Sequence, residues 1–252
     1  MRVALISDIH GNLVALDAVL QDVAERRADH IVCLGDISFS GPQPHECVER
    51  IRALGCPTVM GNCDEASLLM RQRDLAPDLA HASSRWGAWV AAIDRWSAEA
   101  LTDDDAAYLA ALPMTITVEL GPGASLLCAH GSPQSFSHRL LPETPAEQVE
   151  ALVGPVEALA LASGHTHVAM LRRLGALTIV NPGSVGLPMA SDASGGLYNP
   201  PEYAEYGMLT WEAGELSWEP RRVALDVEAV WAAARASGMP HADRWRGDWS
   251  RP

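Results

Sequence analysis

Five short segments of the sequence place aspartate, asparagine or histidine directly after an apolar run. They read, in chain order, SDIHGN, LGDI, MGNCD, CAHGS and SGHTH. Carboxylates, amide oxygens and imidazoles are the donors that intermediate divalent ions such as manganese, iron, nickel or zinc take in proteins. A glycine beside the polar residue lets the backbone turn sharply and approach a ligand closely. The chemistry that these residue types could support is therefore the binding of divalent ions at the ends of strands.

Each segment alone has an ordinary structural explanation. An aspartate after a strand often caps the next helix, and a histidine there is often packed half-buried. Alternate residues of a strand point to the same side, so we expect Asp8 and His10 to hold one ion together. His165 and His167 can do the same only if the chain bends at that point. Five such strand ends in one chain favour a metal site over five separate structural roles.

The elements that must position these residues alternate between strand and helix signals over the first sixty residues. Apolar runs at 2–7 and 30–35 predict buried strands, and the apolar spacing at 13–23 and 47–54 predicts helices. Residues 57–62 predict a third short strand. Short buried strands that alternate with amphipathic helices imply a mainly parallel sheet, whose ligand-binding loops follow the carboxyl ends of the strands.

The rest of the chain adds further elements to one predicted domain, residues 1–252. Residues 77–113 are rich in alanine and tryptophan and predict a helical insertion. Residues 115–120 and 125–130 predict paired strands, and 156–163 a buried strand. Residues 206–225 predict a hairpin that turns at Ala213-Gly214. A helix and a tail are expected over 226–252.

Composition narrows the class of protein. The net charge of −14 and the isoelectric point near 4.9 oppose binding of a nucleic-acid polymer through a basic face. No run of eighteen or more apolar residues occurs, and the first residues resemble a strand rather than a secretion signal. The five cysteines are scattered and form no C-x-x-C pair, so neither a disulfide framework nor a zinc knuckle is predicted. We expect a cytoplasmic protein that does not bind a membrane.

The five segments also form an ordered set of motifs. D-x-H, G-D, G-N-C-D, a single histidine and G-H-x-H follow one another from Asp8 to His167, and N-P-G-S follows at 181–184. In this the chain resembles the calcineurin-like metallophosphoesterases, most closely their small bacterial and archaeal phosphodiesterase branch. The resemblance covers roughly the first 190 residues. It implies an α/β fold in which a two-sheet β-sandwich is flanked by helices.

The resemblance also implies two divalent metal ions, manganese first, with iron, nickel or zinc as alternatives. It implies that one aspartate bridges two sets of three ligands. These are Asp8, His10 and His167 for one ion, Asn62, His130 and His165 for the other, and Asp36 as the bridge. Two ions about 3.5 to 4 Å apart can activate a bridging hydroxide and clamp the phosphoryl oxygens of a substrate.

The residue after Asn62 departs from the wider family pattern. Many relatives read G-N-H-[DE], and their histidine is thought to protonate the leaving oxygen while the following carboxylate orients it. This chain has Cys63 and Asp64 at these positions, and both are candidate catalytic residues. Cys63 could be a weak proton donor or a small packing residue, and Asp64 could orient the loop. Because general acid catalysis contributes typically 100-fold to 10,000-fold, its loss would slow the reaction without abolishing it.

Other polar residues are weaker candidates. Asn12 could cap the following helix or contact the substrate phosphate, and Asn62 could also contact substrate. His45 and His138 are predicted on loops near the ligands, where either could supply the missing proton, although a surface histidine is the commoner explanation.

The sequence leaves more than one function open. The first hypothesis is a metal-dependent phosphodiesterase that hydrolyses small or nucleotide-like phosphodiesters. The alternative is a phosphomonoesterase or a nucleotide-polyphosphate hydrolase that uses the same site. A non-catalytic metal-binding scaffold is a third hypothesis, weakened because all seven ligands are present. The expected partner is a small phosphoester substrate, and the oligomeric state is left open.

Overall fold

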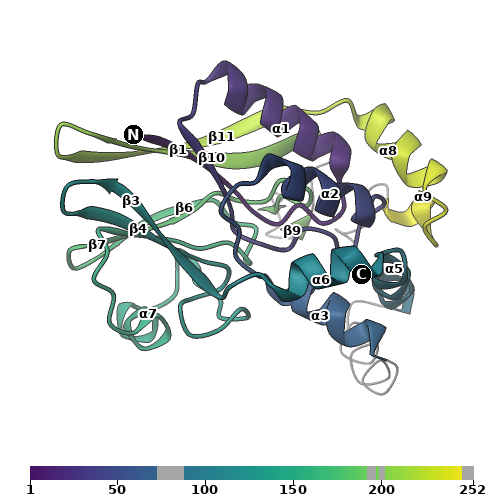
Figure 1. Cartoon of the computed structure of the whole chain (residues 1–252), viewed down its shortest axis with the longest axis horizontal. Coiled ribbons are helices and arrows are strands. Elements are labelled where there is room, and N and C mark those ends of the chain that lie inside the picture. Colours follow the sequence, from purple (N-terminus) through teal and green to yellow (C-terminus); the bar gives the residue numbers. More distant parts are fainter. Residues whose placement is uncertain (73–87, 192–196, 199–201, 246–252) are drawn as a thin grey trace.

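The computed structural model describes residues 1–72, 88–191, 197–198 and 202–245. Two sheets pack face to face, and helices cover their outer faces (Figure 1). This arrangement confirms the predicted α/β fold with a two-sheet β-sandwich flanked by helices. Among the described residues, no helix is both long enough and apolar enough to cross a membrane.

The first sheet has four strands in the order β11-β10-β1-β2. Their bounds are β1 Arg2–Ile6, β2 His30–Cys33, β10 Tyr203–Glu212 and β11 Glu215–Ala224. Strand β1 lies in the middle, parallel to β2 and antiparallel to β10, with Val3 opposite Leu209. The long hairpin β10–β11 forms the edge and turns at Ala213 and Gly214, as predicted.

The second sheet has five strands in the order β3-β4-β5-β7-β6. Their bounds are β3 Thr115–Gly121, β4 Ala124–Ala129, β5 Ala160–Ala162, β6 Met170–Leu174 and β7 Leu177–Asn181. A short pair, β8 Ala190–Ser191 and β9 Leu197–Tyr198, stands apart from both sheets. Both main sheets mix parallel and antiparallel pairs, so the expectation of a mainly parallel sheet is wrong.

The apolar core lies in three layers because alternate strand residues face opposite sides of a sheet. Val3 and Leu5 of β1 point into the space between the two sheets, where they meet Leu126 of β4. Ala4 and Ile6 point the other way, toward the outer helices of the first sheet. Those helices are α1, Leu13–Glu25, and α2, Pro44–Leu54. The outer face of the second sheet is covered by α7, Ala146–Val153.

Residues 57–62 do not form the third strand that the sequence predicted. Thr58 makes a single parallel bridge to Cys33, and helix α3, Asn62–Arg71, begins four residues later. Asn62 is instead the first residue of this helix. Asn62 thereby reaches the same edge of the structure as the residues that follow β1 and β2.

A group of helices packs beside the sandwich, on the right of Figure 1. They are α5 Ala88–Glu99, α6 Asp103–Ala110, α8 Val227–Ala236 and α9 Ala242–Trp245. Helices α5 and α6 confirm helical structure over 88–110 of the predicted insertion, and 77–87 lie outside the described residues. Helix α8 confirms the predicted helix near the carboxyl end, whereas residues 246–252 of the tail lie outside the described part of the chain.

Candidate metal centre

The seven predicted ligands converge although they come from far apart in the sequence. Asp8 and His10 follow β1, Asp36 follows β2, and Asn62 begins α3. His130 follows β4, and His165 and His167 follow β5. Both sheets therefore deliver polar loops to one place at the ends of their strands.

The donor atoms of these residues form overlapping groups. Atoms of Asp8, His10 and His167 lie within 4.8 Å of one another, and so do atoms of Asp36, His130 and His165. These groups coincide with the two predicted ligand sets, apart from Asn62 and the shared Asp36.

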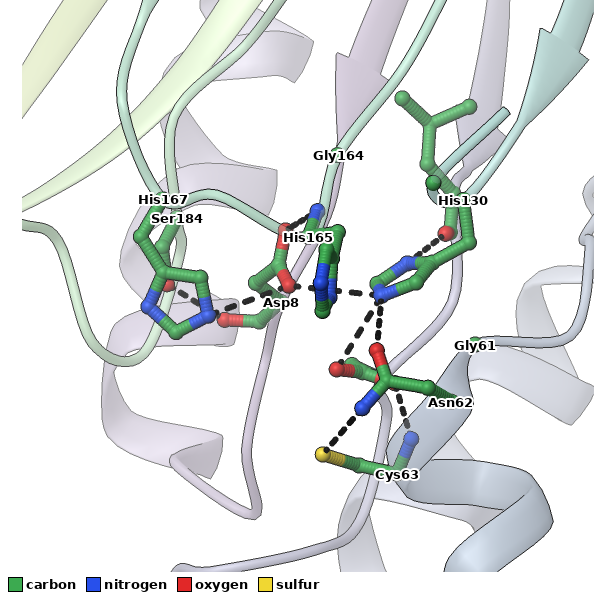
Figure 2. Close-up of polar contacts among 12 residues, drawn as sticks. Asp8, Gly61, Asn62, Cys63, His130, Gly164, His165, His167 and Ser184 are labelled. Carbon is green, nitrogen blue, oxygen red and sulfur yellow. Dashed lines mark hydrogen bonds and ion pairs between the residues drawn. The ribbon is translucent and has the colours of Figure 1, made fainter. Parts of the chain in front are cut away.

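Distances between individual atoms link the two groups. Asp8 Oδ1 lies 3.2 Å from His167 Nε2, and Asp36 Oδ2 lies 3.2 Å from His130 Nε2. Asp36 Oδ2 is also 3.8 Å from His10 Nε2, so the aspartate faces both groups. In Figure 2, Asp8 and His165 lie between His167 on one side and His130 with Asn62 on the other. The arrangement is a continuous row of oxygen and nitrogen donors.

The backbone conformation that brings these donors together differs from the one that strand alternation predicted. Asp8, His10 and Asp36 have φ values of 56°, 49° and 55°, and His165 and His167 have 65° and 58°. These are left-handed conformations outside the strands, since β1 ends at Ile6. Aspartate and histidine are among the few non-glycine residues that adopt this region readily. Asp8 and His10 converge because the chain coils tightly, not because a strand alternates.

Hydrogen bonds to backbone carbonyls fix the orientation of two histidine rings. His10 Nδ1 lies 2.9 Å from Phe39 O, and His167 Nδ1 lies 2.6 Å from Leu187 O. A carbonyl only accepts, so each Nδ1 carries a proton, and in the neutral ring each Nε2 presents a lone pair. The two Nε2 atoms face each other at 3.1 Å. Two lone pairs at this separation repel unless a cation or a proton lies between them.

His130 shows the same arrangement on the other side of the row. Its Nδ1 donates to Leu34 O at 2.7 Å, which leaves Nε2 as an acceptor when the ring is neutral. That Nε2 lies 3.0 Å from the amide oxygen Asn62 Oδ1 and near the carboxylate of Asp36. In the neutral ring these atoms are all acceptors, so either a proton on Nε2 or a cation must lie between them. In addition, Asp8 Oδ1 is buried and has no hydrogen-bond partner among the described residues. The donor set therefore fits bound cations, and its oxygen and imidazole donors suit divalent metals.

The pKa values of the histidines and aspartates in this row also favour positive charge among the donors. Burial lowers the pKa of His130, but the carboxylates of Asp36 and Asp8 outweigh burial and raise it to about 10. Burial also opposes the raised pKa of His167, which the Asp8 carboxylate produces. Despite burial, the pKa of Asp8 is lowered to about 2 by the same histidines. Burial and His130 together lower the pKa of His165 to about 4. The carboxylates therefore favour positive charge among these donors.

Asp64 holds the loops that carry two of the ligands. Its carboxylate is fully buried and accepts from three backbone N–H groups: Gly61 at 2.9 Å, Asp36 at 2.8 Å and Ile37 at 2.9 Å. Burial and the charge of Asp36 raise the pKa of Asp64 to about 7. A Cβ atom on Gly61 would lie 2.1 Å from Asp36 Oδ1, so only glycine fits there. These contacts are the ones that the predicted role of Asp64 in orienting the loop requires.

Cys63 lies beside the ligands and is half-buried. Its Sγ is within 4.8 Å of donor atoms of His10 and Asp36, and it accepts from Asn62 Nδ2 at 3.3 Å. Its backbone N–H donates to Asp36 Oδ1 at 2.8 Å. The side chain packs against Phe39, which agrees with the predicted packing role. Burial, followed by the Asp36 charge, raises the pKa of the thiol well above its usual value.

Asn12 caps helix α1, as one of its two predicted roles requires. Its Oδ1 accepts from Ala15 N at 3.1 Å, and its Nδ2 donates to Gly186 O at 3.4 Å. Contact of Asn12 or Asn62 with a substrate phosphate stays a prediction.

The two alternative proton sources are held by other side chains. His45 lies in the first turn of α2 rather than on a loop, which corrects the prediction, and its Nδ1 pairs with Asp105 Oδ2 at 2.7 Å. His138 lies on the loop after β4, and its Nδ1 is 2.9 Å from Ser132 Oγ.

Several groups that shape the centre were missed from the sequence. They include the carbonyls of Phe39, Leu187 and Leu34, and Ser184, whose hydroxyl donates to Asp8 O at 2.7 Å. Every residue has a carbonyl, so no residue type could have identified the first three. Ser184 was accessible only as part of the N-P-G-S motif, without a stated role.

Comparison with known proteins now identifies the family. Residues 1–199 match the model of the calcineurin-like phosphoesterase superfamily domain. The chain belongs to this superfamily. A metallophosphoesterase from Sphaerobacter thermophilus has a similar crystal structure, with a TM-score of 0.70 and 28% identity over 97% of this chain and 98% of that one. The recognition made from the five motifs is therefore confirmed.

Two further relatives of this calcineurin-like chain add to the comparison. A hypothetical protein from Pyrococcus horikoshii OT3 shares the fold, with a TM-score of 0.74 and 22% identity over 95% of this chain and 94% of that one. An uncharacterised protein of Methanocaldococcus jannaschii is 36% identical over 132 residues. That match covers 52% of this chain and 50% of the relative, so it spans about half the length of the curated protein.

Proposed function

We propose that this calcineurin-like chain is a dinuclear-metal-dependent phosphodiesterase that hydrolyses small or nucleotide-like phosphodiesters in the cytoplasm. The observation that carries the proposal is the row of buried nitrogen and oxygen donors that converge at the ends of the strands. The Nε2 atoms of His10 and His167 lie 3.1 Å apart, and His130 Nε2 lies 3.0 Å from the amide oxygen of Asn62. Cations among these atoms would be coordinated by them, and family membership supports divalent metals as those cations.

We assign one ion, manganese by preference, to each set of donors. Asp8, His10 and His167 would hold the first, Asn62, His130 and His165 the second, and Asp36 would face both. When bound, such ions lower the pKa of a coordinated water and neutralise charge on phosphoryl oxygens. The carbonyls behind the histidines keep each Nε2 directed at its ion, and Asp64 holds the loops of Asp36 and Asn62 in place.

The proton for the leaving group limits the substrates. The side chain at the position after Asn62 is Cys63, whose thiol has a raised pKa and a short reach. Such a thiol is a poor general acid at neutral pH. Substrates whose leaving oxygen needs little protonation are therefore favoured. This residue supports a narrower range of leaving groups than a histidine at the same position would allow.

The charge of the substrate favours a diester over a monoester. A monoester carries up to one more negative charge on its phosphoryl group than a diester and gains more from an additional cationic side chain. The sequence contains no lysine, and Met189 follows Pro188 where relatives often have arginine. Neither a lysine nor an arginine directly after Pro188 is therefore present to bind that additional charge.

The test compares a diester and a monoester of the same aryl alcohol, bis(p-nitrophenyl) phosphate and p-nitrophenyl phosphate, with added manganese. We expect faster release of nitrophenol from the diester. The variant Asp36→Asn keeps a residue that tolerates a left-handed φ but removes the shared charge. It should lose activity by on the order of 100-fold or more. A faster monoester reaction would support the monoesterase alternative, and unchanged turnover in Asp36→Asn would support the non-catalytic scaffold.

A further inference from the structure

The helices beside the sandwich form an apolar cluster that lies next to the metal centre. We call it the accessory cluster. Its buried members are Trp89, Val90 and Ile93 of α5, Leu187, Val230 and Ala234 of α8, Met239, and Trp245 of α9. Helix α5 comes from the insertion, α8 and α9 come from the carboxyl end, and Leu187 belongs to the loop after β7. The cluster therefore joins two additions to the sandwich to a loop of the centre.

One contact of this cluster reaches the backbone that orients His10. Trp245 Nε1 donates to Ser40 O at 2.8 Å, in a buried position. Ser40 Oγ donates to the buried Asp94 of α5 at 2.5 Å, and Ser40 itself has a left-handed φ of 68°. The preceding residue, Phe39, supplies the carbonyl that holds His10 Nδ1. The carbonyl of Ser40 is thus held by α9 and its hydroxyl by α5, two helices that lie outside the sandwich.

A second contact reaches the backbone that orients His167. Leu187 places its side chain in the accessory cluster and its carbonyl 2.6 Å from His167 Nδ1. Its N–H donates to Ser184 Oγ at 2.8 Å, and the same hydroxyl donates to Asp8 O. Asp8, His10 and His167 are the three residues assigned to one ion. His10 is linked to the accessory cluster through the loop of Phe39 and Ser40. Asp8 and His167 are linked to it through the loop that contains Leu187.

The other ligand set is supported differently. His130 Nδ1 is held by Leu34 O, and Leu34 is packed in the core between the two sheets. Asp64 fixes the amino end of α3, where Asn62 lies, through Gly61 N. His130 and Asn62 thus take their orientation from the sandwich and from a buried carboxylate, whereas the His165 N–H donates to Asp8 Oδ2 at 3.1 Å.

We propose that Trp245 and Leu187 are positioning residues for one of the two metal sites, that of Asp8, His10 and His167. Trp245 and Leu187 would then act mainly on the affinity of this site and much less on that of the site of Asn62, His130 and His165. The inference rests on the proposed dinuclear centre. Loss of a hydrogen-bond partner of a ligating histidine typically lowers metal affinity by about 10- to 100-fold. A residue that only positions such a partner acts less directly, so its replacement should lower metal affinity by about tenfold.

The test measures manganese binding by calorimetry in full-length protein with one site disabled. His130→Ala leaves the site of Asp8, His10 and His167, and His10→Gly leaves the other; glycine accepts the left-handed backbone at that position. Trp245→Phe keeps the aromatic ring but removes the indole N–H that Ser40 O accepts. We expect about tenfold weaker binding in the His130→Ala background and about twofold or less in the His10→Gly background.

Two further variants separate positioning from general loss of packing. Leu187→Ala withdraws the side chain from the cluster but keeps the carbonyl, and it should give the same selective loss. Trp211→Phe is the matched control, because Trp211 packs against the core between the sheets and not against the accessory cluster. It should weaken neither site.

The outcomes distinguish this inference from the proposed function. Equal weakening of both sites by Trp245→Phe, or no weakening of either, would overturn the inference while the unmodified chain still binds two ions. An unmodified chain that binds no manganese would overturn the metal centre and this inference together.

Discussion

Replacement of Asp64 should destabilise the protein in a graded way that depends on how many N–H groups keep a partner. The carboxylate is fully buried and accepts from three backbone N–H groups. A buried donor left without a partner costs about 1 to 3 kcal/mol. Asp64→Ala removes all of these acceptors, so we expect a loss of about 3 to 9 kcal/mol in the free energy of unfolding. That is a large share of the stability of a typical domain, about 5 to 15 kcal/mol.

Asp64→Asn should cost much less than Asp64→Ala. Its amide oxygen can replace Oδ2, which accepts from Gly61 and Asp36, while its NH₂ group would face Ile37 N–H as a second donor. One lost acceptor corresponds to about 1 to 3 kcal/mol. Urea unfolding of the metal-free protein measures the difference, and it should be done near pH 8, above the pKa of about 7, so that the carboxylate is ionised.

The control for charge is Asp103→Asn. The Asp103 side chain is fully exposed and pairs with Arg71, so its loss should leave the urea midpoint nearly unchanged. The reasoning is refuted if Asp64→Ala and Asp64→Asn unfold at the same urea concentration with the same slope, because the number of orphaned donors would then not matter.

The remaining predictions concern proton donation, acid stability and backbone space. Cys63→His should raise the rate of hydrolysis of an alkyl diester by about 100-fold and leave the rate for the p-nitrophenyl diester nearly unchanged, because only a poor leaving group needs the general acid. Steady-state assays of both substrates measure the difference. Burial raises the pKa of Asp22, but hydrogen bonds from tyrosine and arginine side chains outweigh burial and lower it from 3.8. The stability that Asp22 contributes is therefore present above pH 3.8 and lost as the pH falls below it. Acid unfolding monitored by circular dichroism should accordingly show a shallower loss of stability in Asp22→Asn. Gly61→Ala should weaken manganese binding and lower the melting temperature, since its Cβ would lie 2.1 Å from Asp36 Oδ1; an unchanged melting temperature would contradict that close approach.

The sequence predicted the central strands well because their burial is encoded locally. The apolar runs at 2–7, 30–35 and 125–130 correspond to β1, β2 and β4. Strands β6 and β7 were missed, although Gly175 with φ of 58° marks the turn between them. Burial alternates along β6, but its sequence, MLRRL, does not alternate apolar and polar residues, which leaves a weak periodic signal. Strand order was not predictable, because pairs such as Val3 with Leu209 join residues that no local pattern connects.

The identity of the candidate ligands was predictable and their geometry was not. Residue type pointed to the five segments, since carboxylate, amide and imidazole groups after strands stand out from an apolar background, and the family resemblance implied the seven ligands within them. The explanation for Asp8 and His10 was wrong, because strand alternation does not operate beyond Ile6. Ring orientation depends on the carbonyls of Phe39 and Leu187, whose positions are set by helices from elsewhere in the chain.

The left-handed backbone at the candidate ligands restricts which amino acids evolution and the experimenter can place there. Asp8, His10, Asp36, His165 and His167 all have φ between 49° and 65°. Aspartate, asparagine, histidine and glycine tolerate this region, whereas other residues cost roughly 1 to 2 kcal/mol and branched ones more. An alanine scan of the centre would therefore mix conformational strain with the loss of a donor atom. Asparagine or glycine replacements measure the loss of the donor atom with less added strain. Valine or isoleucine at these positions would both remove the donor atom and place a branched side chain in a left-handed conformation.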